Sequence, residues 1–196
     1  MKCLYCDNEI KKITIYSFLI EEDKLCDKCR KQILLNHRKI KLDGLQVESF
    51  YDYNSLFKSL IIQYKECCDE ALANVFLYGI KEYIKLKYQG YQIVYMPSSK
   101  EKLYKRGFNH LKGIYKDLDM KVIDGLKYKE ELIQQGKNVN ERSKMKENFI
   151  YEGKKLNKVL MVDDILTTGS SMMGAYNALK PYCNKIKGLV LASVKS

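Results

Sequence analysis

The chain has 196 residues, of which 46% are hydrophobic and two are proline. A chain of this length and composition can bury one medium-sized core beside a smaller module. It contains no run of about 18 apolar residues, and its N-terminus lacks the apolar stretch of a signal peptide. These features argue against a membrane-spanning or secreted protein, and we expect a soluble, cytoplasmic one.

The charge of the chain is strongly basic, with 35 Lys and Arg residues against 24 Asp and Glu residues and a formal net charge of +11. Bases concentrate in residues 28–41, where no acid occurs, and in residues 127–158. A basic surface attracts polyphosphates and nucleic acids. Many soluble proteins rich in lysine have a similar balance, so the charge alone leaves nucleic-acid binding open.

Four cysteines near the N-terminus form two Cys-x-x-Cys pairs, Cys3 with Cys6 and Cys26 with Cys29, and 19 residues separate the pairs. This spacing is typical of a four-thiolate zinc ribbon or finger. Because four protein ligands leave no open coordination position, we expect a structural zinc ion in a module over residues 1–43. Two disulfides are the alternative, although the odd total of seven cysteines favours a reducing compartment.

Strand-like and helix-like patterns alternate along the rest of the chain. We predict a small hairpin at residues 13–20 and strands at residues 45–53, 91–96, 159–163 and 187–194. Apolar stripes predict helices at four places: Phe57, Leu60, Ile61 and Tyr64; Leu72, Val75, Phe76, Gly79, Ile80 and Tyr83; Leu103, Gly107, Leu111, Ile114, Tyr115 and Leu118; and Met172, Ala175, Tyr176 and Leu179. This alternation indicates an α/β domain over residues 44–196, with parallel strands joined by helical crossovers.

The most informative segment begins with the apolar run 159–162. Two acids, Asp163 and Asp164, come next, and a polar turn containing Gly169 follows them. Such a run is typical of a buried strand, and ligands bind beyond the carboxyl ends of such strands. The hydroxyls of the turn and the free N–H groups of the next helix can hold a phosphate. The acids can accept hydrogen bonds from sugar hydroxyls, so the segment predicts a site for a phosphorylated sugar such as ribose 5-phosphate.

Two other interpretations of this segment remain. The acid-ended strand of a nucleoside triphosphatase would need a glycine loop that ends in Gly-Lys-Ser or Gly-Lys-Thr. Gly169 and Gly174 have the right separation, but Ala175 follows the second glycine. The other interpretation is a core strand followed by a helix whose Ser and Thr side chains only cap its first N–H groups.

A second polar loop follows the predicted strand 91–96, so both loops should emerge at the same edge of the sheet. Ser98 and Ser99 could hold a pyrophosphate that Lys102 or Arg106 neutralises, and Arg is the better fork for two phosphate oxygens. The neighbouring lysines are expected to lie in water. We do not expect catalysis from the histidines, because His110 shares a helix face with apolar residues.

Several motifs in a fixed order carry a resemblance to a known family. Residues 159–169 resemble the 5-phosphoribosyl-1-pyrophosphate (PRPP) loop of type I phosphoribosyltransferases, which has an apolar strand, two acids, three residues and Thr-Gly. The paired cysteines, the Gln63-Tyr64-Lys65 segment and the Arg106-Gly107-Phe108-Asn109 segment extend this likeness over nearly the whole chain. Together they resemble the competence protein ComF family, whose phosphoribosyltransferase-like members are linked to DNA uptake and natural transformation. The family usually has Gln where this chain has His110.

The resemblance implies a phosphoribosyltransferase-like parallel sheet flanked by helices, with a small N-terminal zinc ribbon. PRPP would bind with Mg²⁺, and Asp163 and Asp164 would hold the ribose hydroxyls as the catalytic acids. The remaining PRPP-binding residues would be Ser98, Ser99, Lys102, Arg106, Ile165, Leu166, Thr167, Thr168, Gly169, Ser170 and Ser171. A flexible loop with Gln134 and Arg142 matches the family pattern loosely.

Two functions from different classes are compatible with this site. One is a binding protein in DNA uptake that uses PRPP as a ligand and contacts single-stranded DNA, a helicase or another DNA-processing partner. The other is an active phosphoribosyltransferase that moves ribose 5-phosphate from PRPP to a nitrogen base. The sequence does not identify an acceptor pocket, so both hypotheses stand.

Overall fold

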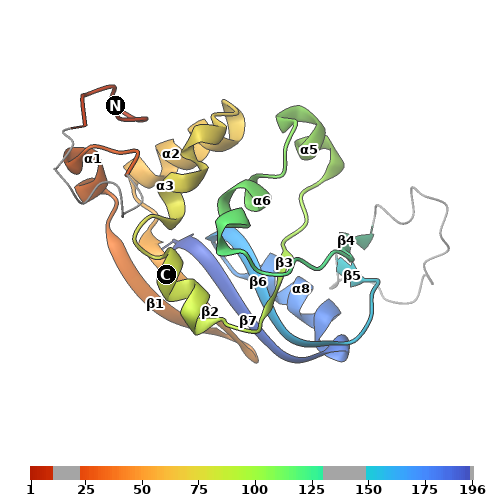
Figure 1. The fold of residues 1–196 in the computed structure, drawn as a ribbon. Helices are drawn as coiled ribbons and strands as arrows, with labels where there is room; N and C mark the ends of the chain where they lie inside the picture. Colours follow the sequence, from red (N-terminus) through yellow and green to blue (C-terminus); the bar gives the residue numbers. More distant parts are fainter. Residues whose placement is uncertain (11–22, 130–148, 195–196) are drawn as a thin grey trace.

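The computed structural model describes residues 1–10, 23–129 and 149–194, and these contain a five-stranded sheet in the order β1-β2-β7-β6-β3 (Figure 1). β1 and β2 form an antiparallel hairpin, whereas β2, β7, β6 and β3 run parallel to one another. The predicted α/β class with a mostly parallel sheet is therefore confirmed. The strands of this sheet are β1 (Leu35–Leu42), β2 (Leu45–Asp52), β3 (Gln92–Tyr95), β6 (Leu156–Leu166) and β7 (Cys183–Ser193).

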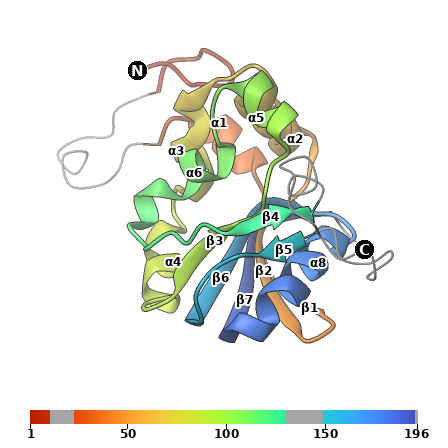
Figure 2. The same ribbon diagram turned by 90° about the vertical axis from the view of Figure 1, so that its right-hand side faces the viewer.

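Helices cover both faces of the sheet, and Figure 2 shows α8 on the face opposite α4. The α-helices are α1 (Asp27–Gln32), α2 (Ser55–Glu66), α3 (Ala73–Leu77), α4 (Lys81–Lys87), α5 (Lys100–Arg106), α6 (His110–Tyr115) and α8 (Ser170–Leu179). Short 3₁₀ turns are η2 (Glu70–Leu72), η3 (Lys116–Leu118) and η4 (Lys180–Tyr182). A small antiparallel sheet of β4 (Leu126–Tyr128) and β5 (Phe149–Tyr151) packs on α8. None of the helices in the described part of the chain has the length and hydropathy needed to cross a bilayer.

Two of the predicted helices are interrupted. The stripe that begins at Leu72 is divided among η2, α3 and α4, and Gly79 between the last two has a positive φ of 78°. The stripe that begins at Leu103 is divided between α5 and α6 at Gly107, where φ is 76°. Asn109 then caps α6 by accepting a 3.1 Å hydrogen bond from the backbone N–H of Lys112. The apolar period predicted one helix in each case because buried residues at helical spacing lie on both sides of the break, although Gly79 and Gly107 themselves are exposed.

The strand that carries the acid pair is longer than predicted. β6 extends three residues beyond the expected end, so that Asp163 and Asp164 lie inside it. The reason is its neighbour β7, which continues to pair with β6 through Asp163 opposite Val190 and Leu166 opposite Ser193. The four apolar residues before the acids are fully buried, as the sequence predicted.

The N-terminal module contacts the helical layer through Arg30. Its guanidinium donates hydrogen bonds of 2.6 and 2.5 Å to the carboxylate of Asp23 and one of 3.2 Å to the backbone carbonyl of Val75 on α3. The predicted boundary after residue 43 falls in the turn of the β1–β2 hairpin, so β1 shares the central sheet with β2. The hairpin predicted at 13–20 lies outside the described residues.

Tyr64 on α2 lies at the contact between the helices that cover one face of the sheet. Its hydroxyl donates a 2.7 Å hydrogen bond to the backbone carbonyl of His110. Its ring packs edge-on against Phe76 and Phe108, with centroid distances of 5.5 and 5.4 Å. Gly113 leaves room for this arrangement, since a Cβ there would stand 2.3 Å from the hydroxyl oxygen.

We expect Gly113→Ala to lower the free energy of unfolding by about 1–3 kcal/mol, because an extra methyl group strains a well-packed core. Tyr64→Phe removes the hydroxyl that this methyl group would strike. The same glycine substitution should therefore cost less in the Tyr64→Phe background. Urea denaturation of the four proteins measures the coupling energy. Equal costs in both backgrounds would contradict the contact.

Candidate functional site

The acid pair lies near the carboxyl end of β6, at the edge of the sheet where the predicted phosphate loop begins. Asp163 is partly exposed, whereas Asp164 is 6% exposed. The Asp163 carboxylate accepts a 2.9 Å hydrogen bond from the backbone N–H of Asp164, and the Asp164 carboxylate accepts one of 2.9 Å from that of Ile165. From α6, the Tyr115 hydroxyl donates a 2.8 Å hydrogen bond to the backbone carbonyl of Asp163. These bonds fix the backbone and one carboxylate oxygen of each acid.

A lysine that the sequence analysis gave no role neutralises Asp164. Lys65 near the end of α2 places its ammonium nitrogen 2.6 Å from Oδ2 of Asp164. Nε2 of His110 lies 3.8 Å from the same oxygen. The segment Gln63-Tyr64-Lys65 contributes to the family resemblance, and that is the one signal in the sequence that points to Lys65.

Arg106 belongs to the same group of charges. Its guanidinium donates a 3.0 Å hydrogen bond to the carboxylate of Glu66, and a second nitrogen lies 3.4 Å from Nδ1 of His110. If Arg106 donates to Nδ1, the neutral imidazole carries its proton on Nε2, which faces Asp164. Lys65, Glu66, Arg106, His110 and Asp164 thus form a ring of contacts among α2, α5, α6 and β6, which we call the charge ring.

The protonation states in the charge ring follow from burial and proximity. Burial lowers the pKa of His110 to about 4, so the imidazole is neutral at pH 7. Burial and the neighbouring carboxylate of Asp164 raise the pKa of Asp163 from 3.8 to about 8. Burial also acts to raise the pKa of Asp164, but the charge of Lys65 outweighs it and the pKa is lowered. At neutral pH the acid pair therefore carries one negative charge and one proton.

His110, Asp163 and Asp164 form one group that could hold a metal ion, since their ligand atoms lie within 4.8 Å of one another. Imidazole nitrogen and carboxylate oxygen are suitable ligands for several divalent ions. A metal there would compete with the ammonium group of Lys65 for Asp164 and with the proton on Asp163. The arrangement is therefore better suited to hydrogen-bonding neutral hydroxyls than to holding a metal ion tightly.

The predicted phosphate loop follows β6 directly. Gly169 caps α8 with φ at 80°, and a Cβ at this position would stand 2.9 Å from Leu42 at the tip of the β1–β2 hairpin. The hydroxyls of Thr168 and Ser170 lie 3.0 Å apart. Thr167, Thr168, Ser170 and Ser171 are exposed, whereas Leu166 is buried and Ile165 is half-buried. The hydroxyl-bearing residues are thus accessible to a ligand, and the two apolar residues pack in or against the core.

The second polar loop lies at the same edge of the sheet, because β3 pairs in parallel with β6. The register continues one residue further, where the backbone N–H of Met96 donates a 3.0 Å hydrogen bond to the carbonyl of Val162. Ser98 and Ser99 follow, and the hydroxyl of Ser99 accepts a 3.4 Å hydrogen bond from the backbone N–H of Lys102. The structure therefore places the start of this loop at the same edge of the sheet as the acid pair. Gln134 and Arg142 of the predicted flexible loop lie outside the described residues.

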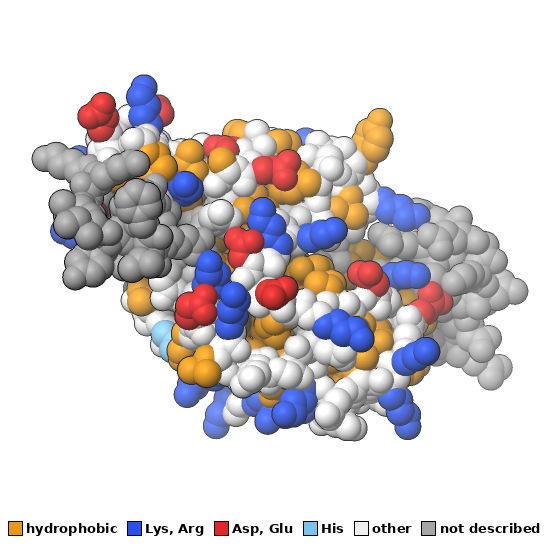
Figure 3. All heavy atoms as spheres, in the orientation of Figure 1, with side chains coloured by type: hydrophobic (Ala, Val, Ile, Leu, Met, Phe, Trp, Pro, Cys, Tyr) orange, Lys and Arg blue, Asp and Glu red, His pale blue; other side chains and the backbone are white. Residues whose placement is uncertain are grey.

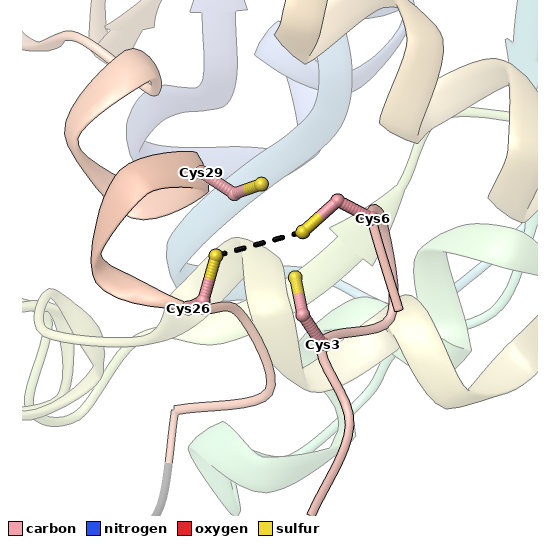
Figure 4. A group of neighbouring side chains, drawn as sticks. All are labelled: Cys3, Cys6, Cys26 and Cys29. Carbon is pink, nitrogen blue, oxygen red and sulfur yellow. Dashed lines mark hydrogen bonds between the residues drawn. The ribbon is translucent and has the colours of Figure 1, made fainter. Parts of the chain in front are cut away.

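The four N-terminal cysteines form a second candidate site. All four sulfur atoms lie within 4.8 Å of one another, and those of Cys6 and Cys26 are 3.6 Å apart. Figure 4 shows the four side chains pointing toward a common centre. A tetrahedral zinc site with Zn–S bonds of about 2.3 Å places its sulfurs about 3.8 Å apart. The donor set and spacing fit a metal ion, and none of these cysteines is in a disulfide.

The raised pKa of Asp163, about 8 against 3.8 for a free side chain, makes stability depend on pH. Between these values the folded protein holds a proton that the unfolded chain has lost, so the free energy of unfolding falls as pH rises, by at most about 1.4 kcal/mol per unit. Asp163→Asn should remove this fall. Urea denaturation at several values between about pH 5 and pH 8 measures it, with the exposed Asp119→Asn as control. Parallel pH profiles for wild type and Asp163→Asn would contradict the raised pKa.

Comparison with known proteins identifies a curated relative and a distant structural neighbour. No family model matches the chain. The solved hypoxanthine phosphoribosyltransferase of Staphylococcus aureus has a TM-score of 0.41 and 15% identity; the match covers 63% of this chain and 64% of that one. The competence protein ComFC of Streptococcus pneumoniae (strain ATCC BAA-255 / R6) is 29% identical over 199 aligned positions, which cover 88% of this chain and 90% of the relative. Over most of its length, the chain is thus a homologue of a competence protein ComFC, as its motifs predicted.

Proposed function

We propose that the chain is a ComFC-like competence protein that binds PRPP and acts in DNA uptake and natural transformation. The observation that carries this is the parallel pairing of β3 with β6, which brings Ser98 and Ser99 to the same sheet edge as Asp163 and Asp164. Ligands of open α/β sheets bind at this edge, beyond the carboxyl ends of the strands. PRPP offers a 5-phosphate, two ribose hydroxyls and a pyrophosphate. At this edge the hydroxyls of the turn suit the 5-phosphate, the carboxylates suit the ribose hydroxyls and the cations suit the pyrophosphate.

Each part of the proposed site has a role set by its chemistry. The turn from Thr167 to Ser171 would hold the 5-phosphate with its hydroxyls and with the first N–H groups of α8. Asp163 and Asp164 would hold the two ribose hydroxyls. Ser98, Ser99, Lys102 and Arg106 would hold the pyrophosphate, and Mg²⁺ bound to that group would offset its charge. Since Arg106 is bound to Glu66 in the free protein, the pyrophosphate has to compete with this carboxylate.

We expect PRPP with Mg²⁺ to raise the melting temperature of the wild-type protein by about 5–10 °C at a hundredfold excess over its dissociation constant. The double variant Asp163→Asn, Asp164→Asn should lose this shift, because it loses the carboxylates that accept the ribose hydroxyls. The double variant Asp117→Asn, Asp119→Asn makes the same two Asp→Asn substitutions away from the site and should keep the shift. An undiminished shift in the first variant would remove the acids from the PRPP site.

A second candidate function is phosphoribosyl transfer to a nitrogen base. The feature that favours it is the acid pair of Asp163 and Asp164, which carries one negative charge at neutral pH at the sheet edge proposed to bind PRPP. Departure of pyrophosphate leaves positive charge at the ribose C1, and a nearby carboxylate would stabilise that charge. A pyrophosphate-release assay with PRPP and a panel of bases separates the two functions, since a binding protein leaves PRPP intact with every base.

Single-stranded DNA and a helicase or another DNA-processing protein are the partners that this role implies. The name of the pneumococcal relative supports a role in competence, and the net charge of +11 supports contact with a polyanion. Binding through phosphate contacts weakens steeply as salt concentration rises, and the slope reports how many contacts form. Titration of a fluorescent oligonucleotide at several salt concentrations provides that slope.

We further propose that the cysteine cluster holds a structural zinc ion. Four thiolates prefer zinc, and a closed set of four protein ligands leaves no position for a substrate. The ion would hold the two Cys-x-x-Cys pairs together in a segment with little core of its own.

Purified protein should contain about one zinc ion per chain. Cys26→Ser should lose most of it and loosen the N-terminal residues, because three thiolates hold zinc less tightly. Elemental analysis gives the zinc content, and limited proteolysis reports the loosening. Cys67→Ser, at an exposed cysteine outside the cluster, is the control and should keep its metal. Wild-type protein from zinc-containing medium that holds no zinc would overturn this assignment.

A further inference from the structure

A hollow of about 390 Å³ lies on the side of the sheet that α4 covers, toward the amino ends of β6 and β7. Lysines from three elements line it: Lys39 and Lys41 of β1, Lys185 and Lys187 of β7, and Lys87 of α4. We call this hollow the lysine pocket. Lys and Arg side chains gather along the lower edge of the molecule in Figure 3, in the region where Figure 1 draws the β1–β2 hairpin.

Strand register explains why these lysines share one face. Lys39 and Lys41 stand opposite Glu48 and Gln46 on β2, and the Lys187 ammonium group donates a hydrogen bond to the Gln46 side chain. Because successive side chains of a strand alternate between faces, Lys185 lies on the same face as Lys187. Side chains from β1, β2 and β7 therefore form a continuous polar floor.

The charges of the lysine pocket are poorly balanced. Among the residues that the structure describes, Glu48 is the one acid that lines it, and this carboxylate is already bound to Lys87 and His37. Within the described residues no ion pair joins Lys39, Lys41 or Lys185 to an acid. Burial, together with the like charges of Lys185 and Lys87, lowers the pKa of Lys187. Converging ammonium groups repel one another, and a bound anion would relieve this repulsion.

Two tyrosines add an aromatic wall to the pocket. Tyr88 and Tyr91 meet edge to face, with ring centroids 5.4 Å apart. Tyr88 is buried and Tyr91 is partly exposed, with the ammonium nitrogen of Lys158 lying 5.9 Å from the centre of the Tyr91 ring. An exposed aromatic ring next to clustered cations suits a ligand that carries both a flat ring and phosphate groups.

The lysine pocket is separate from the proposed PRPP site. Lys185 and Lys187 lie near the start of β7, whereas Asp163 and Asp164 lie near the end of β6. In the register of these strands Lys185 stands opposite Lys158, six residues before Asp164, so the pocket lies toward the amino ends of the strands and the acid pair toward their carboxyl ends. One ligand of PRPP size cannot occupy both.

We propose that the lysine pocket is a second anion site, which takes a phosphorylated small molecule of nucleotide size with its phosphates on Lys39, Lys41, Lys185 and Lys187 and its ring against Tyr91. Pockets of about 300–1,000 Å³ commonly hold ligands of this size. A nucleic-acid strand offers the same groups, but its backbone would need a groove that continues beyond such a hollow. The site does not depend on the PRPP proposal.

Calorimetry of the full chain with ATP and with inorganic tripolyphosphate, in magnesium-free buffer without a chelator and at fixed ionic strength, tests this site. Both probes should bind the wild-type protein. Lys185→Gln, Lys187→Gln should weaken both by about tenfold or more, on the order of 1.4 kcal/mol. Lys112→Gln, Lys116→Gln removes the same charge from exposed positions on α6 and η3 and should leave both affinities within about twofold. Tyr91→Leu should weaken ATP and spare tripolyphosphate.

Several outcomes would overturn the site. Equal losses in the two lysine variants would show general attraction to a basic surface, and neither probe binding at about 1 mM would leave the pocket without a ligand of this class. A single-stranded oligonucleotide of about 12 residues that binds through Lys185 and Lys187 while both small probes fail would assign the lysines to a strand instead. If Lys185→Gln, Lys187→Gln fails to fold, Lys39→Gln, Lys41→Gln on β1 replaces it with the same expectations. Wild-type binding of ATP is unaffected by a failure of PRPP to bind, so the two sites are judged separately.

Discussion

The ion pair between Lys65 and Asp164 joins the helical layer to β6 of the central sheet. The two residues are 99 positions apart in the chain, and both side chains are largely buried. A buried carboxylate without a counter-charge is costly, and removing one partner of a buried pair commonly costs about 3–5 kcal/mol. The lowered pKa of Asp164 depends on this contact, and the charge that Asp164 keeps helps to raise the pKa of Asp163. Lys65 is therefore the residue that keeps two adjacent acids compatible with a folded strand end.

The charge ring also determines what a ligand meets at this edge. Arg106 and Asp164, which would contact different parts of PRPP, are held by consecutive residues of α2, Glu66 and Lys65. An incoming pyrophosphate has to exchange with Glu66, whereas ribose hydroxyls can add to a carboxylate that keeps its lysine. Binding of the pyrophosphate is thus coupled through α2 to binding of the ribose hydroxyls. In the roles assigned above, no atom of the ligand contacts that helix.

Much of the fold could be predicted from local patterns, and what could not depended on distant contacts. The apolar run before Asp163 predicted a buried strand because four fully buried residues leave an unmistakable pattern. The paired cysteines predicted their cluster because the spacing of a metal site is local. By contrast, the breaks at Gly79 and Gly107 follow from left-handed backbone that the apolar period does not reveal. No local pattern could pair Lys65 with Asp164, or extend β6 along β7, because these contacts exist only once the sheet is assembled.

The contact between Leu42 and Gly169 ties the first strand of the sheet to the turn proposed to hold the 5-phosphate. β1 is an edge strand of the five-stranded sheet, and its partner β2 would become a bare edge without it. A shortened protein that starts after residue 43 would keep every residue of the phosphate turn, yet it would lose the side chain against which that turn rests and expose a strand prone to aggregation. Recombinant fragments of this chain should therefore retain Leu35–Leu42, even where the cysteine cluster is to be omitted.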